Sequence, residues 1–140
     1  MRPDDENAAY VIQDEASRLL GDAGFGRVIG YKIGCTTSAM QTYLGIDHPA
    51  AGYMYASSSR ADGFVLARGQ AVRPGVECEI ALTLASPLRA REVPFTRETV
   101  IPSIAAVHAA IEIVDERYED WRTLGGETLI ADDFFHAGLI

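Results

Sequence analysis

The clearest strand in the chain is predicted by the stretch Val76-Glu77-Cys78-Glu79-Ile80-Ala81-Leu82. Successive side chains of a strand point to opposite faces, so Glu77 and Glu79 share one face and the residues between them share the other. Residues two apart on one face lie roughly 6.5–7 Å apart, and two carboxylates at that spacing can converge on one ion. Cys78 alternates away from the glutamates and is expected in the core.

A third glutamate stands in an equally apolar stretch, Ala109-Ala110-Ile111-Glu112-Ile113-Val114. An ionised carboxylate is very costly to bury alone, and three carboxylates close together repel one another. A divalent cation with oxygen ligands is the simplest partner that would hold them there. The sequence therefore predicts that Glu77, Glu79 and Glu112 bind Mg²⁺ or Mn²⁺.

Such a site suits 2-oxo acids as small-molecule substrates. Their carboxylate and adjacent carbonyl oxygen can chelate a metal, which then stabilises an enolate. Lys32, the only lysine, lies in Gly30-Tyr31-Lys32-Ile33-Gly34 and is a candidate to hold the substrate carboxylate or to move a proton. The alternative for Lys32 is a strand lysine whose ammonium reaches solvent.

The remaining candidates give weaker signals. Arg117 is a candidate for substrate binding, or for a plain ion pair with Glu112 in a domain that holds no metal. Asp132-Asp133 could supply ligands, but a loop pair is the plainer interpretation. We expect His48 on the surface, His108 in the core as a hydrogen-bonded histidine, and His136 packed behind Phe134-Phe135.

Length and periodicity predict one α+β domain over residues 1–140. Helices are expected at 5–20, from Thr37 or Ser38 to Leu44, and from Thr96 to about Val107, unless Pro102 moves that last start nearer Ile101. Strands are expected at 28–33, 52–55, 63–67, 76–84 and 111–114, with a break at Arg73-Pro74-Gly75 and a loop over 118–128. The last residues, Ala137-Gly138-Leu139-Ile140, read as the start of a buried strand, which suggests a truncated domain.

Composition excludes several classes of partner. The formal net charge is −8 and there is no basic run, which argues against binding to nucleic acid or to an anionic membrane surface. No apolar run approaches a membrane span, and the polar, acidic N-terminus is unlike a signal peptide. Two cysteines give neither a disulfide framework nor a zinc pattern. We therefore expect a cytoplasmic protein.

Several motifs together resemble one known family. In chain order they are Gly30-Tyr31-Lys32-Ile33-Gly34-Cys35-Thr36-Thr37, Leu44-Gly45-Ile46-Asp47-His48-Pro49 with Gly52, Val76-Glu77-Cys78-Glu79-Ile80-Ala81, Ala110-Ile111-Glu112-Ile113-Val114-Asp115-Glu116-Arg117, Asp120-Trp121 and Ile130-Ala131-Asp132. Their order and spacing resemble the 2-keto-4-pentenoate hydratase and 4-oxalocrotonate decarboxylase branch of the fumarylacetoacetate hydrolase superfamily. The resemblance runs from about residue 8 to 140 and covers about half of a typical member. The chain has Ala131-Asp132-Asp133 where the family commonly has Ala-Asp-Asn.

The resemblance implies a fold and a reaction. The fold would be a mixed, strand-rich α+β roll, here lacking its C-terminal half, in a homo-oligomer. Glu77, Glu79 and Glu112 would be the Mg²⁺ or Mn²⁺ ligands and Lys32 an active-site residue. The implied reaction is metal-dependent addition of water to 2-hydroxy-2,4-dienoates, giving 4-hydroxy-2-oxo acids in aromatic catabolism.

Three alternatives stay open beside that reaction. The nearest is decarboxylation of 4-oxalocrotonate, which uses the same enolate chemistry. A non-catalytic fragment or assembly subunit is a second alternative, supported by the missing half. The third is a structural domain whose glutamates pair with arginine. A hydrolase of the fumarylacetoacetate type is less favoured, because the sequence shows no matching His–Glu pair to activate water.

Overall fold

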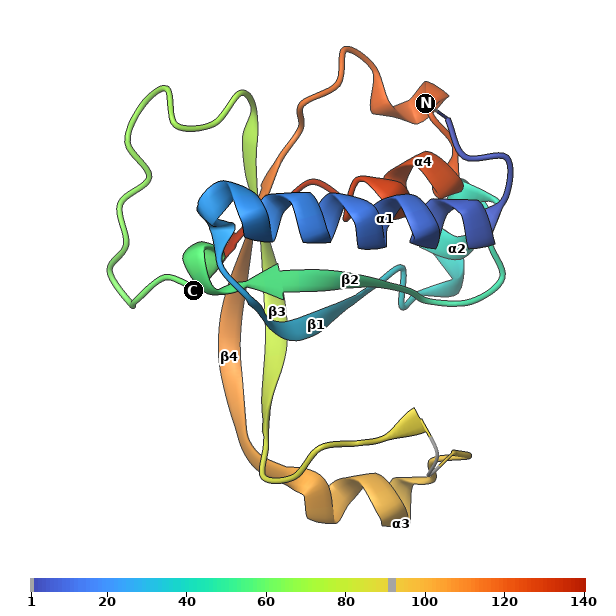
Figure 1. Ribbon diagram of the computed structural model, residues 1–140, viewed down its shortest axis with the longest axis vertical. Helices are drawn as coiled ribbons and strands as arrows, with labels where there is room; N and C mark the ends of the chain where they lie inside the picture. Colours follow the sequence, from blue (N-terminus) through green and yellow to red (C-terminus); the bar gives the residue numbers. More distant parts are fainter. Residues whose placement is uncertain (1, 91–92) are drawn as a thin grey trace.

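The computed structural model describes residues 2–90 and 93–140, which form a mixed α+β fold with two antiparallel sheets (Figure 1). The first sheet pairs β1 (Val28–Gly34) with β2 (Ala50–Tyr55). The second places β4 (Ile104–Asp115) between β3 (Pro74–Leu84) and β5 (His136–Leu139). The helical elements are α1 (Glu6–Leu20), η1 (Gly21–Phe25), α2 (Ser38–Leu44), η2 (Ala56–Ser58), α3 (Arg97–Val100), η4 (Ile101–Ser103), η5 (Trp121–Thr123) and α4 (Gly126–Ala131).

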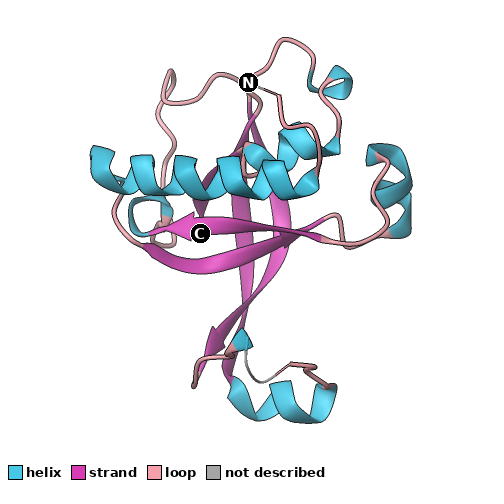
Figure 2. Ribbon diagram, turned by 45° about the vertical axis from the view of Figure 1, so that its right-hand side comes forward, coloured by secondary structure: helices cyan, strands magenta, loops and turns pink. Residues whose placement is uncertain are grey.

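The strands of the two sheets run across one another, and different helices lie beside each sheet (Figure 1). Helix α1 lies along β2, and the strands of the first sheet run across the long β3–β4 ribbon (Figures 1 and 2). The far end of that ribbon carries α3, away from α1 (Figure 1). The ribbon therefore enters the main body only at the end where β3 begins, β4 finishes and β5 is paired.

The two predicted N-terminal helices are confirmed, and their ends follow from local sequence. The Asp5 carboxylate accepts a hydrogen bond from the Ala8 amide at 2.8 Å, which caps α1. Thr37 caps α2 in the same way through the amide of Met40. Helix α2 ends at Gly45, whose φ of 71° lies in the left-handed region where a side chain would be strained.

A small buried core joins α1 to β2 and α4. Ala9, Ala50 and Ile130 are buried together. Between them the buried Gln13 side chain donates hydrogen bonds to the carbonyls of Ala51 at 3.1 Å and Ile130 at 2.7 Å. One side-chain amide therefore donates to backbone carbonyls of both β2 and α4, which fixes α1 relative to both elements.

The predicted helix from Thr96 to about Val107 is confirmed only in its first part, and its end is wrong. Thr96 does cap a helix, through the Thr99 amide, but α3 ends at Val100 and Pro102 lies in the 3₁₀ turn η4. From Ile104 the chain is strand and pairs with β3, so that Leu84 faces Ile104 and Leu82 faces Val107. Pairing with a long neighbouring strand here overrides the helical propensity of the alanines.

Two other predicted boundaries also differ. The strand expected over 63–67 is absent; this stretch is a turn in which the Phe64 amide donates to the Ala61 carbonyl at 3.1 Å. The predicted break at Arg73 is real, but Pro74 and Gly75 already belong to β3, because proline is tolerated as the first residue of a strand. The loop expected over 118–128 contains η5 and the start of α4.

The strand prediction for 76–84 is confirmed, but the burial predicted for its apolar face is wrong. Val76, Ile80 and Leu82 are exposed, and Cys78, which was expected in the core, is exposed with them. Val107 and Ile111 on β4 continue this surface. Opposite the glutamates, the β3–β4 ribbon therefore presents a continuous apolar face, far more than scattered apolar residues would give.

A buried carboxyl group links β2 to the segment after α4. The Oδ1 atom of Asp133 accepts a hydrogen bond from the Tyr53 amide at 2.9 Å, while its Oδ2 is buried without a partner among the residues that the structure describes. The close approach depends on Gly52, because a Cβ atom there would lie 1.9 Å from Oδ1. Burial raises the pKa of the Asp133 carboxyl to about 6, although Lys32 and His136 oppose the shift.

The raised pKa of Asp133 predicts a specific pH dependence of stability. Because folding raises this pKa from 3.8 to about 6, the folded state holds the proton more tightly, and the unfolding free energy falls as pH rises from about 4 to about 6. We expect Asp133→Asn to remove this loss of roughly 3 kcal/mol, at about 1.4 kcal/mol per pH unit. Urea unfolding at a series of pH values measures it.

The matched control for this prediction is Asp62→Asn, in an exposed turn. The difference in unfolding free energy between Asp133→Asn and the native protein should grow across this pH range, whereas the control should follow the native profile. Parallel profiles for all three proteins would show that Asp133 is ionised throughout.

Candidate metal centre

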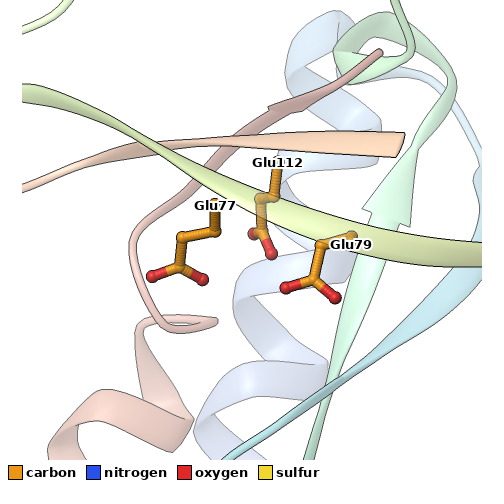
Figure 3. Close-up of side chains that lie close together, drawn as sticks. All are labelled: Glu77, Glu79 and Glu112. Carbon is orange, nitrogen blue, oxygen red and sulfur yellow. The ribbon is translucent and has the colours of Figure 1, made fainter. Parts of the chain in front are cut away.

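The predicted glutamates lie side by side on one face of the β3–β4 ribbon. Glu77 is directly opposite Glu112 in the antiparallel register, and Glu79 is two residues further along β3 (Figure 3). One carboxylate oxygen from each residue lies within 4.8 Å of the others. Figure 3 shows the three carboxyl groups extending from the same side of the ribbon. Three oxygen donors at this separation can surround one small cation.

The three carboxylates differ in burial. Glu112 is only 4% exposed, whereas Glu77 is exposed. The apolar sequence context, which is the same for both, therefore predicted burial correctly for Glu112 and wrongly for Glu77. The difference follows from strand position and neighbours: β4 is the central strand of its sheet, and Lys32 and His136 pack against Glu112, whereas β3 is an edge strand.

Buried Glu112 is compensated by two donors. The Lys32 ammonium forms an ion pair with its Oε1, and the Lys32 side chain is only 11% exposed. Nδ1 of His136 lies 2.8 Å from the same oxygen. Lys32 therefore does not reach into solvent, which rules out the alternative interpretation of that residue.

The pKa values of the two facing glutamates move in opposite directions. Burial alone would raise the pKa of Glu112, but hydrogen bonds and charge from His136 and Lys32 outweigh it and hold the pKa below its usual range. The pKa of Glu77 is raised, first by partial desolvation of its carboxyl group, although the residue as a whole is exposed, and then by the negative charge of Glu112. The cluster thus carries excess negative charge on its open side, which a cation would relieve.

Arg117 does not join the cluster. Its guanidinium forms a 2.9 Å ion pair with Asp132 and reaches the carbonyls of Phe135 and His136 at 3.5 and 3.4 Å. Asp132 also accepts a hydrogen bond from the Tyr118 hydroxyl. The pairing of Glu112 with Arg117, on which the structural-domain alternative was built, is therefore contradicted.

Sequence reasoning missed His136 as a site residue. The prediction that it packs is correct as far as burial goes, but its ring also hydrogen-bonds to Glu112 and to Ser58. A polar ring next to a run of apolar residues on an expected buried strand was the available signal. His48 is exposed and pairs with Glu6, as expected, whereas His108 is exposed beside Thr83 and not in the core.

The cluster opens to solvent at Glu77, which is exposed, whereas Glu112 is buried. A cavity of about 510 Å³ lies between α1 and the segment from Ala131 to Ala137, and its lining includes Asp133 and His136 but not the three glutamates. His136 therefore contacts both this cavity and the Glu112 carboxylate. Among the described residues, no helix has the length and apolar character needed to cross a bilayer.

The chain is similar to known hydratases and to a known decarboxylase. No family model matches the chain. It is 40% identical to a 2-keto-4-pentenoate hydratase from Burkholderia vietnamiensis over 117 residues, which are 84% of this chain and 44% of that protein. It is 30% identical to a 4-oxalocrotonate decarboxylase from Pseudomonas putida over 114 residues, which are 81% of this chain and 42% of that protein.

A solved structure gives the same relationship. The fold superposes on 4-oxalocrotonate decarboxylase from Pseudomonas putida G7, complexed with magnesium and adipate, with a TM-score of 0.88 and 26% identity. The match covers 97% of this chain and 50% of that one. The chain thus spans about half the length of the proteins it matches. Over that half it is a homologue of the 2-keto-4-pentenoate hydratases and 4-oxalocrotonate decarboxylases, the family that its sequence motifs resemble.

Proposed function

We propose that this chain carries the metal-binding half of a hydratase that adds water to 2-hydroxy-2,4-dienoates, yielding 4-hydroxy-2-oxo acids in aromatic catabolism. The observation that carries the proposal is the convergence of Glu77, Glu79 and Glu112 within 4.8 Å on one face of the ribbon. The three carboxylates would hold Mg²⁺ or Mn²⁺, since oxygen donors suit both ions. The magnesium in the structure of the homologous decarboxylase supports this choice of ion.

The chemistry follows from the charges at the site. A divalent ion held by the three glutamates would supply Lewis acidity that stabilises negative charge on a carbonyl oxygen of a 2-oxo acid. Lys32 lies beside Glu112, where its ammonium can hold the substrate carboxylate or transfer a proton during ketonisation. Water then adds to the carbon at the far end of the conjugated system. Glu112, which is held ionised, acts as a fixed negative charge and not as the proton carrier.

Decarboxylation of 4-oxalocrotonate is the second candidate. Its support is the superposition on a decarboxylase complexed with magnesium and adipate. Both reactions pass through an enolate, so Lys32 and the glutamates would serve either one. The choice between the two reactions depends on the residues that surround the substrate tail.

The exposed apolar face of the ribbon supports a homo-oligomer, or a union with further polypeptide that completes the family's roll. Val76, Ile80 and Val107 each expose well over half of their surface. The alternative proposal is a non-catalytic fragment or assembly subunit. The experiments below separate this alternative from the enzyme.

Metal binding is the first test. Isothermal titration with Mn²⁺ should show one site per chain, and Glu79→Gln should weaken binding by more than about tenfold, because even the loss of a residue that only orients a ligand costs 10–100-fold. Glu119→Gln, at an exposed position outside the cluster, is the control and should bind as the native protein does. Equal Mn²⁺ affinity in the native protein, Glu79→Gln and Glu119→Gln would show that the three glutamates do not form a metal centre.

Turnover is the second test. With Mg²⁺ present, the absorbance of 2-hydroxypenta-2,4-dienoate should fall as water adds, whereas release of carbon dioxide from 4-oxalocrotonate would identify the decarboxylase. Lys32→Met should lower kcat by about 10²-fold or more, the usual contribution of a positioned proton-transfer group. Lys32→Arg keeps the charge and controls for loss of the ion pair. A folded, metal-loaded protein that is inactive on both substrates would support the non-catalytic alternative.

A further inference from the structure

His136 connects Glu112 to a turn in a distant part of the chain. Its ring is only 3% exposed, with Nδ1 at 2.8 Å from Oε1 of Glu112 and Nε2 at 3.0 Å from Oγ of Ser58. Ser58 is itself held by the backbone of Tyr55, to whose carbonyl Oγ donates at 2.9 Å and from whose amide it accepts at 3.2 Å. Because the single hydroxyl hydrogen of Ser58 goes to the Tyr55 carbonyl, Oγ accepts in its contact with Nε2. The imidazole is thus held at both nitrogens, and it cannot rotate without losing a hydrogen bond.

Both donors to Glu112 use the same oxygen. Lys32 Nζ and His136 Nδ1 each contact Oε1, and neither contact involves Oε2. A carboxylate only accepts hydrogen bonds, so Nδ1 carries the hydrogen in its contact. Two charge-assisted or directional bonds to a single oxygen determine the rotation of the carboxyl plane. Neither donor occupies the second oxygen, Oε2.

The order Ser58–His136–Glu112 matches the connectivity of a nucleophilic triad, but its geometry does not favour that use. Ser58 is buried, and its hydroxyl is engaged by both the amide and the carbonyl of Tyr55. A nucleophile must be approachable by a substrate carbonyl. Ser58 therefore holds the His136 ring in place, and the ring in turn holds the Glu112 carboxylate.

We propose that His136, anchored by Ser58, is a positioning residue that sets the orientation in which Glu112 offers an oxygen to a divalent cation shared with Glu77 and Glu79. The inference rests on the metal centre of the proposed function and adds to it a residue outside the ligand set. Partners that orient metal ligands in this way typically change metal affinity by 10–100-fold when they are removed.

The test compares two substitutions of similar size. His136→Leu fills the space without a donor, whereas His136→Asn places an amide nitrogen where Nδ1 lies. Each variant is titrated with Mn²⁺, and the free ion is measured by electron paramagnetic resonance. Binding should be weakened by about 10–100-fold in His136→Leu. Binding in His136→Asn should return to within a few-fold of native. Thermal unfolding of each metal-free protein is recorded alongside.

Ser58→Ala provides a second, independent arm. It removes the anchor but leaves Nδ1 in place, so it should weaken Mn²⁺ binding by a smaller factor than His136→Leu. Native-like affinity in folded His136→Leu would overturn the positioning role while leaving the metal centre intact. The positioning role would also be overturned if His136→Leu and His136→Asn lost Mn²⁺ affinity equally and in proportion to their lower melting temperatures. If the native protein binds no Mn²⁺, the proposed metal centre fails and the positioning role fails with it.

Discussion

The ion pair between Lys32 and Glu112 is the constraint on which the site depends. It joins β1 of the first sheet to β4 of the second, two residues 80 positions apart in the chain. Removing both charges from water is costly, and breaking such a pair by losing one partner costs more still. The two sheets therefore have to keep their relative position for Glu112 to remain ionised in the interior.

That constraint also explains why the cluster is asymmetric. Glu112 is buried and charge-compensated, whereas its register partner Glu77 faces outward with a raised pKa. The Glu112 carboxylate is thus held in a fixed position, while the Glu77 carboxylate is repelled by the charge of Glu112. A cation entering the cluster would gain most from Glu77 and Glu79 and would find the geometry already set by Glu112.

The sequence predicted those features that depend on local pattern. Period-two alternation placed Glu77 and Glu79 on one face, and capping residues located the ends of α1 and α2. It failed where distant partners decide. The first half of β4 is alanine-rich and reads as helix until β3 pairs with it. The contacts of Lys32 and His136 with Glu112 join segments whose approach no local period encodes.

The apolar side of the β3–β4 ribbon, from Val76 to Leu82 with Val107 opposite, has a consequence for how such proteins diversify. In a strand the two surfaces belong to alternate residues and mutate separately. Changes that recruit a different neighbour onto one surface need not disturb the acidic chemistry on its reverse. A neighbour can then contact one surface while the acidic side chains on the reverse stay unchanged, along the same eleven-residue segment.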